Sequence, residues 1–461
     1  MVWPFVTFPP LPRSIDTKLT PMRSILFKQL QRQINQTRQP LAILYKLLIS
    51  AFIAAALLSV SSCRKDECKD TMRYTIYTPV FASAAEVRAR FKSEAPRPIE
   101  AAGKIYLYGN YIFLNELNEG IHIIDNSNPE APDNFAFINI PGNVDMAVKG
   151  HVLYADSYMD LLAIDISDPH QVKELKRLKD VYPQRVYEYF RATSDSIVID
   201  YLTRDTVVEI PCHRDLLFGG QFNSPGVFAL SSSSDGGNKS GAMAALGKGG
   251  SMARFALLND YLYTVDYSRL NIFGIQNPAS PEKQDELYLF DVVETIFPYR
   301  GNLFIGSQSG MYIYSLQNPA HPVRKGAFGH IRSCDPVVAE DSTAYVTLRG
   351  GSACGGFTNQ LDVLNISDLS NPILIKSYPM SSPYGLGIDG EHLFVCEGSN
   401  GLKFLDASDP QNITSVAQVP VEAFDVIPHN KVLLVTAKDG LYQYDYSNLH
   451  APRLLSKLVI N

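Results

Sequence analysis

The sequence predicts an all-β fold: a seven-bladed β-propeller of four-stranded antiparallel blades. Three observations support this expectation. A motif in which an apolar run is closed by Asp, small polar residues and Pro occurs seven times after residue 100, in close or loose copies. The copies recur about every forty residues once two insertions are set aside, a period typical of repeat architectures. Each period holds four runs of β-forming residues, the content of one propeller blade.

The Asp that closes each apolar run is the marker of the repeat. Its side chain can accept hydrogen bonds from backbone N–H groups two residues on, and Pro cannot extend a strand ladder. We therefore assign this position a structural role in ending the third strand, not a catalytic one. The seven marker positions are Asp125, Asp165, Gly274, Ser315, Asn365, Asp406 and Asp445.

The second repeat shows the four runs of one blade. The expected strands are residues 144–149, 152–156, 161–166 and 172–178. Ahead of the first repeat, residues 73–81 alternate in polarity and carry β-branched and aromatic side chains, which predicts one more strand. Ser83 and Glu86 then have the spacing of a capping box, which predicts a short helix reaching about Phe91.

The start of the chain has the pattern of a secretory leader. Residues 47–60 are uncharged and apolar and follow a basic segment. Fourteen helical residues rise only about 21 Å, less than the roughly 30 Å of a bilayer core. The following Val-Ser-Ser-Cys63 resembles the lipobox of bacterial lipoproteins, which implies cleavage before Cys63 and its lipidation. An ordinary signal peptide with an incidental Cys is the alternative, and translation can start at Met1 or Met22.

These features predict a leader over residues 1–62, a tether over 63–72 and the propeller over 73–461. Residues 64–67 resemble the surface-export tag of some outer-membrane lipoproteins. We expect a monomer on the outer membrane, at the cell surface rather than the periplasmic face, touching the membrane only through its lipid. The net charge is −6 although the leader is basic, so nucleic acid is not an expected partner.

The repeat motif also points to a family. The only Trp is Trp3, in the leader, whereas WD40-type and kelch-type blades depend on Trp. The motif instead resembles the LVIVD-repeat proteins, bacterial β-propellers, over residues 104–461, although it is degenerate at Gly274, Ser315 and Asn365. Because most of that family is uncharacterised, the resemblance implies the fold and no particular activity.

Two insertions interrupt the repeat. Residues 185–250 leave blade 2 and begin with alternating β-type residues, which predicts a projecting ribbon: a partner-binding arm or a tolerated insertion. In blade 5, a Gly-rich stretch contains Cys354, and an antiparallel hairpin brings it to the edge where Cys334 lies. In an exported chain this predicts a Cys334–Cys354 disulfide; a catalytic Cys with His330 is the alternative. The pairing of Cys68, Cys212 and Cys396 stays open.

One face of the propeller is the expected binding face. The loops from second to third strand, and from blade to blade, open on this face around the channel, and function concentrates on such loops. We call it the loop face. Its mixed charges can hold a charged ligand or a structural cation, or form a solvated rim of ion pairs. The candidate residues are Arg332, Asp335, Arg349, Asn359, Glu397, Asp425, Arg254 and Asp156.

The sequence offers no recognisable catalytic or metal motif. It has no His-Glu-x-x-His, no His pair spaced for zinc and no Gly-x-Ser-x-Gly elbow. We assign no catalytic residue, metal or cofactor. The favoured hypothesis is a non-enzymatic scaffold that binds an envelope or extracellular protein or glycan. The alternatives are a hydrolase or lyase using carboxylates such as Asp335 and Glu397 at the channel mouth, and a purely structural envelope component.

Overall fold

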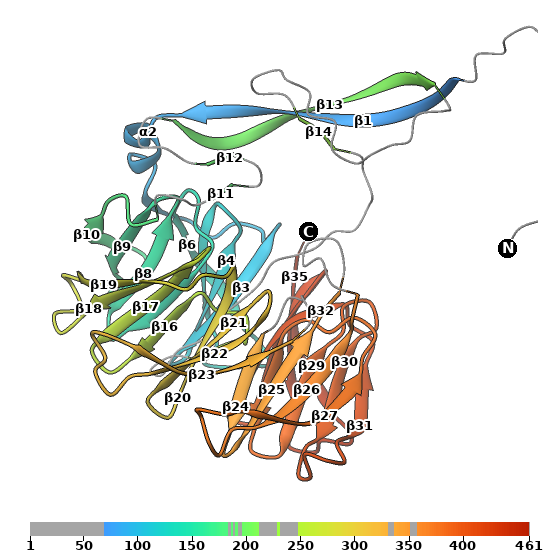
Figure 1. Cartoon of the computed structure of the whole chain (residues 1–461). Coiled ribbons are helices and arrows are strands. Elements are labelled where there is room, and N and C mark those ends of the chain that lie inside the picture. Colours follow the sequence, from blue (N-terminus) through green and yellow to red (C-terminus); the bar gives the residue numbers. More distant parts are fainter. Residues whose placement is uncertain are drawn as a thin grey trace, which may run out of the picture. The chain divides into compact units, whose positions relative to one another are not determined.

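A computed structural model shows the fold of the chain (Figure 1). The chain divides into two compact units, residues 1–72 with 207–220, and residues 73–206 with 221–461, which contain the propeller. The structure describes residues 69–182, 186–187, 190–191, 196–211, 228–230, 248–330, 336–350 and 357–460.

The second unit contains seven blades of four consecutive antiparallel strands, as predicted (Figure 1). Blade 1 holds β3 (Ala102–Tyr108), β4 (Tyr111–Glu116), β5 (Gly120–Asp125) and β6 (Asp133–Asn139). Blade 2 holds β7 (Met146–Lys149), β8 (Val152–Ser157), β9 (Asp160–Asp165) and β10 (Lys173–Leu178). Blade 3 holds β16 (Phe255–Leu258), β17 (Tyr261–Asp266), β18 (Arg269–Gly274) and β19 (Glu282–Tyr288). Blade 4 holds β20 (Val293–Tyr299), β21 (Asn302–Ser307), β22 (Gly310–Ser315) and β23 (Val323–Gly329).

The last three blades repeat the same plan. Blade 5 holds β24 (Val337–Glu340), β25 (Thr343–Leu348), β26 (Gln360–Asn365) and β27 (Ile373–Pro379). Blade 6 holds β28 (Leu386–Asp389), β29 (His392–Cys396), β30 (Leu402–Asp406) and β31 (Thr414–Val419). Blade 7 holds β32 (Ala423–His429), β33 (Val432–Ala437), β34 (Gly440–Asp445) and β35 (Arg453–Val459). The strands of blade 2 agree with their predicted ranges to within two residues.

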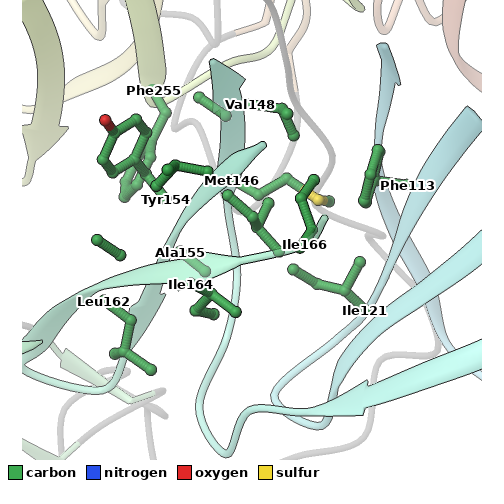
Figure 2. Close-up of a cluster of buried hydrophobic side chains, with 14 of the residues drawn as sticks. Phe113, Ile121, Met146, Val148, Tyr154, Ala155, Leu162, Ile164, Ile166 and Phe255 are labelled. Atoms are coloured by element: carbon green, nitrogen blue, oxygen red, sulfur yellow. The ribbon is translucent and has the colours of Figure 1, made fainter. Parts of the chain in front are cut away.

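The core lies between the blades, where apolar side chains of the first three strands meet their neighbours. Figure 2 shows one such cluster, in which Phe113 of blade 1, Met146 of blade 2 and Phe255 of blade 3 are all buried. Burying a side chain of this size contributes about 1.5–3 kcal/mol. The near-continuous apolar sequence of these strands follows from this packing, because both faces of each blade are covered.

The marker side chains form the predicted turns. Asp406 Oδ1 accepts a hydrogen bond from the Ser408 N–H at 3.0 Å, and Asp125 and Asp445 bond Ser127 and Ser447 in the same way. A second turn of this kind follows, since Asp409 Oδ1 accepts from the Gln411 N–H at 2.9 Å. The strand-ending role of the marker Asp is therefore confirmed.

The segment before blade 1 packs on blade 2. Strand β1 (Lys69–Ala82) contains the predicted strand, and helix α2 (Ala84–Arg88) opens with the predicted Ser83–Glu86 capping box and ends earlier than expected. Val87 of α2 lies in a buried cluster with Tyr158 and Met159 of blade 2. Strand β2 (Lys92–Glu94) then pairs with β6 at the outer edge of blade 1.

Most of the described residues of the insertion lie in strands. Strands β11 (Val186–Tyr187) and β12 (Phe190–Arg191) form a hairpin, and β13 (Ile197–Pro211) and β14 (Phe228–Leu230) both pair with β1. Strand β15 (Lys248–Gly249) pairs instead with β3, the first strand of blade 1. The insertion is therefore not only a projection from blade 2, because its last residues return to the propeller.

Blades 7 and 1 meet without sharing a sheet. Each blade uses four consecutive strands, so no strand from one end of the chain completes the blade at the other end. Apolar side chains of both blades, including Ile105 and Ile427, pack together, and a bridge joins Ile99 to Ile460. Near the axis β15 contacts β32 of blade 7 as well as β3. The return strand of the insertion thus lies at the point of ring closure.

Candidate functional site

The first strands of the blades place one equivalent residue each around the propeller axis. In blade 1 this residue is Lys104. It directly precedes Ile105, which pairs with Leu114, the fourth residue of the second strand. The corresponding residue of every other blade is found by the same rule. We call these positions the axial ring. They are Lys104, Asp145, Arg254, Thr295, Pro336, Gly385 and Asp425.

Two members of the axial ring form a buried ion pair. Lys104 Nζ lies 2.7 Å from Asp145 Oδ2, and both side chains are buried. Asp145 also accepts hydrogen bonds from the backbone N–H groups of Arg254, at 2.6 Å, and Met146, at 2.7 Å. Burial lowers the pKa of Lys104, and the Asp145 carboxylate opposes that shift. The Asp145 carboxylate therefore links blades 1, 2 and 3, and both of its oxygens have partners.

Asp425 is the most unusual member of the axial ring. Its side chain is fully buried, and among the described residues neither carboxylate oxygen has a well-formed hydrogen bond. Gly250 and Gly385 lie so close that a Cβ at either would sit 1.9 or 2.3 Å from a carboxylate oxygen. Burial raises the pKa of Asp425 to about 7, although nearby N–H groups and Lys104 partly oppose the shift. The carboxyl group therefore favours its neutral form up to near-neutral pH.

The segment that leads from β15 into blade 3 covers these charges. Ser251 Oγ accepts a hydrogen bond from the Leu386 N–H of blade 6 at 2.8 Å. Ala253 O accepts one from the Ile296 N–H of blade 4 at 2.6 Å, and Met252 O lies 3.4 Å from Lys104 Nζ. We call residues 248–253 the axial segment. It contacts blades 1, 4, 6 and 7, and it separates the ring carboxylates from solvent.

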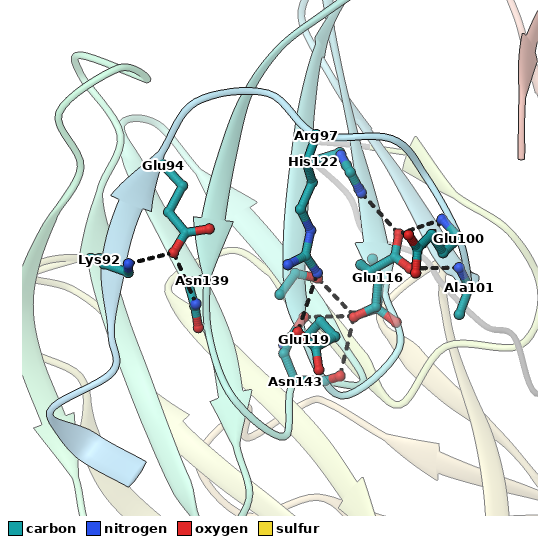
Figure 3. A network of polar contacts seen from close by, with 12 residues as sticks. Lys92, Glu94, Arg97, Glu100, Ala101, Glu116, Glu119, His122, Asn139 and Asn143 are labelled. Carbon is teal, nitrogen blue, oxygen red and sulfur yellow. Dashed lines mark hydrogen bonds and ion pairs between the residues drawn. The ribbon is translucent and has the colours of Figure 1, made fainter. Parts of the chain in front are cut away.

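Glu397, a predicted loop-face residue, lies in the turn between β29 and β30, and its side chain is buried. It lies 2.6 Å from Lys403 Nζ and accepts a hydrogen bond from the Ser381 N–H at 2.6 Å. Blade 1 repeats this arrangement with the same spacing of six residues, because Glu116 contacts His122 at 2.9 Å and the Ala101 N–H at 2.5 Å (Figure 3).

The Glu116–His122 pair is a buried carboxylate–imidazole contact that the sequence did not single out. Burial acts to raise the pKa of Glu116, but the hydrogen bonds from His122 and the preceding backbone hold it below its ordinary value. Both side chains are almost completely buried. The pair ties the third strand of blade 1 to the segment before its first strand, and the shared spacing with Glu397 and Lys403 is the signal that could have revealed it.

The other predicted face residues are also placed by the structure. The Asp156 carboxylate accepts hydrogen bonds from Asn143 Nδ2 and the Val144 N–H, at 2.8 and 2.7 Å, and so shapes the approach to β7. Arg349 stacks over the ring of Tyr384 at 4.1 Å. Asn359 Oδ1 accepts from the Gly350 N–H at 3.0 Å, which closes the base of the Gly-rich loop.

Several predictions lie outside the described residues. Arg332 and Asp335 do, so their place on the loop face stays a prediction. The predicted lipidation at Cys63 and the predicted disulfide between Cys334 and Cys354 also lie there. Cys396 is described: it is a buried free thiol whose pKa burial raises well above its ordinary value.

The loop face carries two features that the sequence did not predict. A hollow of about 510 Å³ is lined by Ser399, Asn400, Gln418, Pro420 and Glu422, from the end of β31 and the loops beside it in blades 6 and 7. Exposed aromatic side chains form the second feature. Within the described blades these are Tyr267, Tyr288, Phe290 and Phe357.

Among the described residues, no group of three or more His, Cys, Asp or Glu side chains could hold a metal ion. No described helix combines the length and apolar character needed to cross a bilayer.

Comparisons with known proteins agree with the repeat assignment. A family model described as LVIVD repeat matches residues 101–137, 142–179 and 342–379, which are blades 1, 2 and 5. A search of curated proteins gives no significant match.

Solved structures resemble this chain only at a low level. A periplasmic gluconolactonase from Pseudomonas aeruginosa has 11% identity and a TM-score of 0.49, with 84% of this chain and 97% of that one covered. BamB from Moraxella catarrhalis has 7% identity and a TM-score of 0.45, with 76% and 82% covered. At this level of similarity, neither indicates what this chain binds or does.

Proposed function

We propose that this chain, a seven-bladed propeller that carries LVIVD repeats, is a non-enzymatic scaffold that binds an envelope or extracellular protein or glycan through its loop face. We further propose that a lipid on Cys63 tethers it to the outer membrane, with the propeller at the cell surface. One observation carries the binding proposal: the axial charges are buried and covered by the axial segment, while the loop face offers the hollow and exposed aromatic rings.

The hydrolase or lyase alternative is less well supported by the same geometry. It needs carboxylates that reach a substrate, yet Glu397 is buried and already bound to Lys403 and Ser381. Asp425 has a pKa of about 7, which suits a general acid, but Gly250 and Gly385 pack directly against its carboxyl group. A purely structural envelope component would need neither a hollow nor exposed aromatic side chains on this face.

A binding experiment with matched variants tests the scaffold proposal. The full chain, purified in detergent, is immobilised and probed with envelope polysaccharides and purified outer-membrane proteins. Ser399→Trp would block the hollow, whereas Ser408→Trp places the same bulk on an exposed turn at the opposite end of blade 6. We expect binding that Ser399→Trp weakens and Ser408→Trp leaves unchanged. Turnover of glycoside, ester or lactone substrates without stable binding would overturn the proposal.

The lipid tether has a separate test. Cells fed an alkyne fatty acid should label the wild-type chain and not a Cys63→Ser variant. Protease added to intact cells should then degrade the wild-type protein if it is displayed outside. Labelling that survives the Cys63→Ser change would refute the anchor, and complete protection from protease would refute surface display.

A further inference from the structure

Three exposed aromatic side chains gather on the loop face of blade 3. Tyr267 is 52% exposed, Tyr288 57% and Phe290 87%, and the rings of Tyr288 and Phe290 meet edge to face at 4.7 Å. Tyr267 lies in the turn between β17 and β18, and the other two lie at the end of β19 and just after it. We call these three residues the aromatic patch.

The backbone holds the aromatic patch together. The Val293 N–H donates to Tyr267 O at 2.7 Å, and the Leu289 N–H donates to Ser268 O at 2.8 Å. Tyr267 and Phe290 both have left-handed backbone, with φ of 52° and 57°. This conformation is costly for bulky residues, and here burial of the rings does not offset the cost. The stability of blade 3 therefore does not explain why aromatic residues occupy these two positions.

Blade 2 shows what the same turn position does when it is covered. Tyr158 stands at the position of Tyr267, with the same φ of 52°, yet it is only 3% exposed. It packs with Ala84 and Val87 at helix α2. Beside it Asp160, the first residue of β9, binds Arg88 of that helix at 2.7 Å. The turn of blade 2 is thus a seat for a short amphipathic helix, held by apolar contact and one ion pair.

Blade 3 presents the same seat with the opposite charge and no described segment on it. Arg269, the first residue of β18, takes the place of Asp160. It contacts Glu286 through one guanidinium nitrogen, and an Arg side chain has five N–H donors in total. A segment that fits this seat needs an apolar side chain for the rings and a carboxylate in the place that Arg88 occupies in blade 2.

We propose that the aromatic patch of blade 3 docks an amphipathic segment of a partner protein, in the way that blade 2 docks the chain's own helix α2. The partner segment presents one or two large apolar side chains to Tyr267 and Phe290 and a carboxylate to Arg269. This inference rests on the proposed scaffold function and selects a protein over a glycan as the occupant of this site.

The test uses a random dodecapeptide library displayed on phage and selected on the full chain. Enriched peptides are then synthesised and their affinities measured by fluorescence anisotropy. We expect an apolar residue near an Asp or Glu in these peptides, and a loss of about tenfold or more for Phe290→Ala and for Tyr267→Asn, because exposed aromatic anchors dominate such interfaces. Arg269→Glu should weaken the acidic peptides most.

Controls separate this inference from its alternatives. Phe357→Ala removes an even more exposed ring from blade 5 and should leave peptide affinity unchanged. Phe290→Ala should melt like the wild type, because the ring is exposed. The protein assignment would be overturned if Phe290→Ala left the affinity for the peptides unchanged. It would also be overturned if binding to a glycan array or to neutral lipid vesicles depended on Phe290. If these peptides fail while binding at the hollow remains sensitive to Ser399→Trp, only this inference fails; if both fail, the scaffold function fails too.

Discussion

At the axis of the propeller, Lys104, Asp145 and Asp425 are buried and covered by the axial segment, whereas on the loop face of blade 3 aromatic rings stand in solvent. The side-chain types are therefore the reverse of what burial alone would favour, with charges inside and apolar rings outside. Lys104 and Asp145 are partners within the chain, and burial favours the neutral form of Asp425. The exposed rings have no such explanation, so the loop face is where a binding partner should be sought.

Replacing Lys104 should cause the largest loss of stability, because it breaks the buried ion pair at the axis. Lys104→Met leaves the Asp145 carboxylate buried without its ammonium partner, which should cost about 3–5 kcal/mol of unfolding free energy. Urea denaturation measures the loss. The control Lys438→Met breaks the exposed pair with Glu422 and should cost less than about 1 kcal/mol. Equal losses of unfolding free energy in the two variants would show that the buried Lys104–Asp145 pair contributes no more than an exposed pair.

The protonation of Asp425 should make stability depend on pH in a specific direction. The folded chain keeps the proton up to about pH 7, while the unfolded chain releases it near the ordinary value of 3.8. Between these values the folded state binds more protons, so stability falls as pH rises. Asp425→Asn should remove this fall, which amounts to as much as about 4 kcal/mol.

Urea denaturation at a series of pH values from 4 to 8 checks this expectation. Asp133→Asn, at the exposed first residue of β6, serves as the control and should keep the wild-type profile. A difference between wild type and Asp425→Asn that is the same at every pH would contradict the assignment.

Crowding the axial segment should have an intermediate effect. In Gly250→Ala the new Cβ would lie 1.9 Å from Asp425 Oδ2, so the segment must shift, at a cost of about 1–3 kcal/mol. Hydrogen exchange should speed up in β3 and β32, which meet at β15, and not in β21. Gly329→Ala meets no atom within 4 Å and is the matched control. Unchanged exchange in β3 and β32 would mean that the segment does not support ring closure.

The smallest effect is expected at a marker turn, away from both regions. Asp406→Ala removes the acceptor for the Ser408 N–H, which should cost about 1 kcal/mol. Ser408→Ala keeps this backbone hydrogen bond and loses only the contact of the exposed Ser408 hydroxyl with Asp406, so it should cost less. In blade 3 the marker position is Gly274, which has no side chain to accept this bond, so the turn forms without it. A loss of unfolding free energy well above about 1 kcal/mol would therefore show that Asp406 has a further role.

The sequence by itself determined the blades. Each marker turn is a contact between residues two apart, and each blade is four strands in immediate succession, so local patterns around Asp125 or Asp406 were sufficient to predict them. The capping box at Ser83 is local in the same way. The number of blades followed from the number of repeats.

Only the tertiary structure decided which charged residues could meet a ligand. Asp425 and Glu397 come from the expected region of each blade, but their burial depends on Gly250, Gly385 and Ser381. The pairing of Lys248 with Leu107 joins positions far apart in the chain, and no local pattern encodes such a contact. Tyr158 and Tyr267 likewise cannot be told apart from local sequence, because they share a turn position and a backbone conformation. Only Tyr158 is buried, because the segment at helix α2 packs over it.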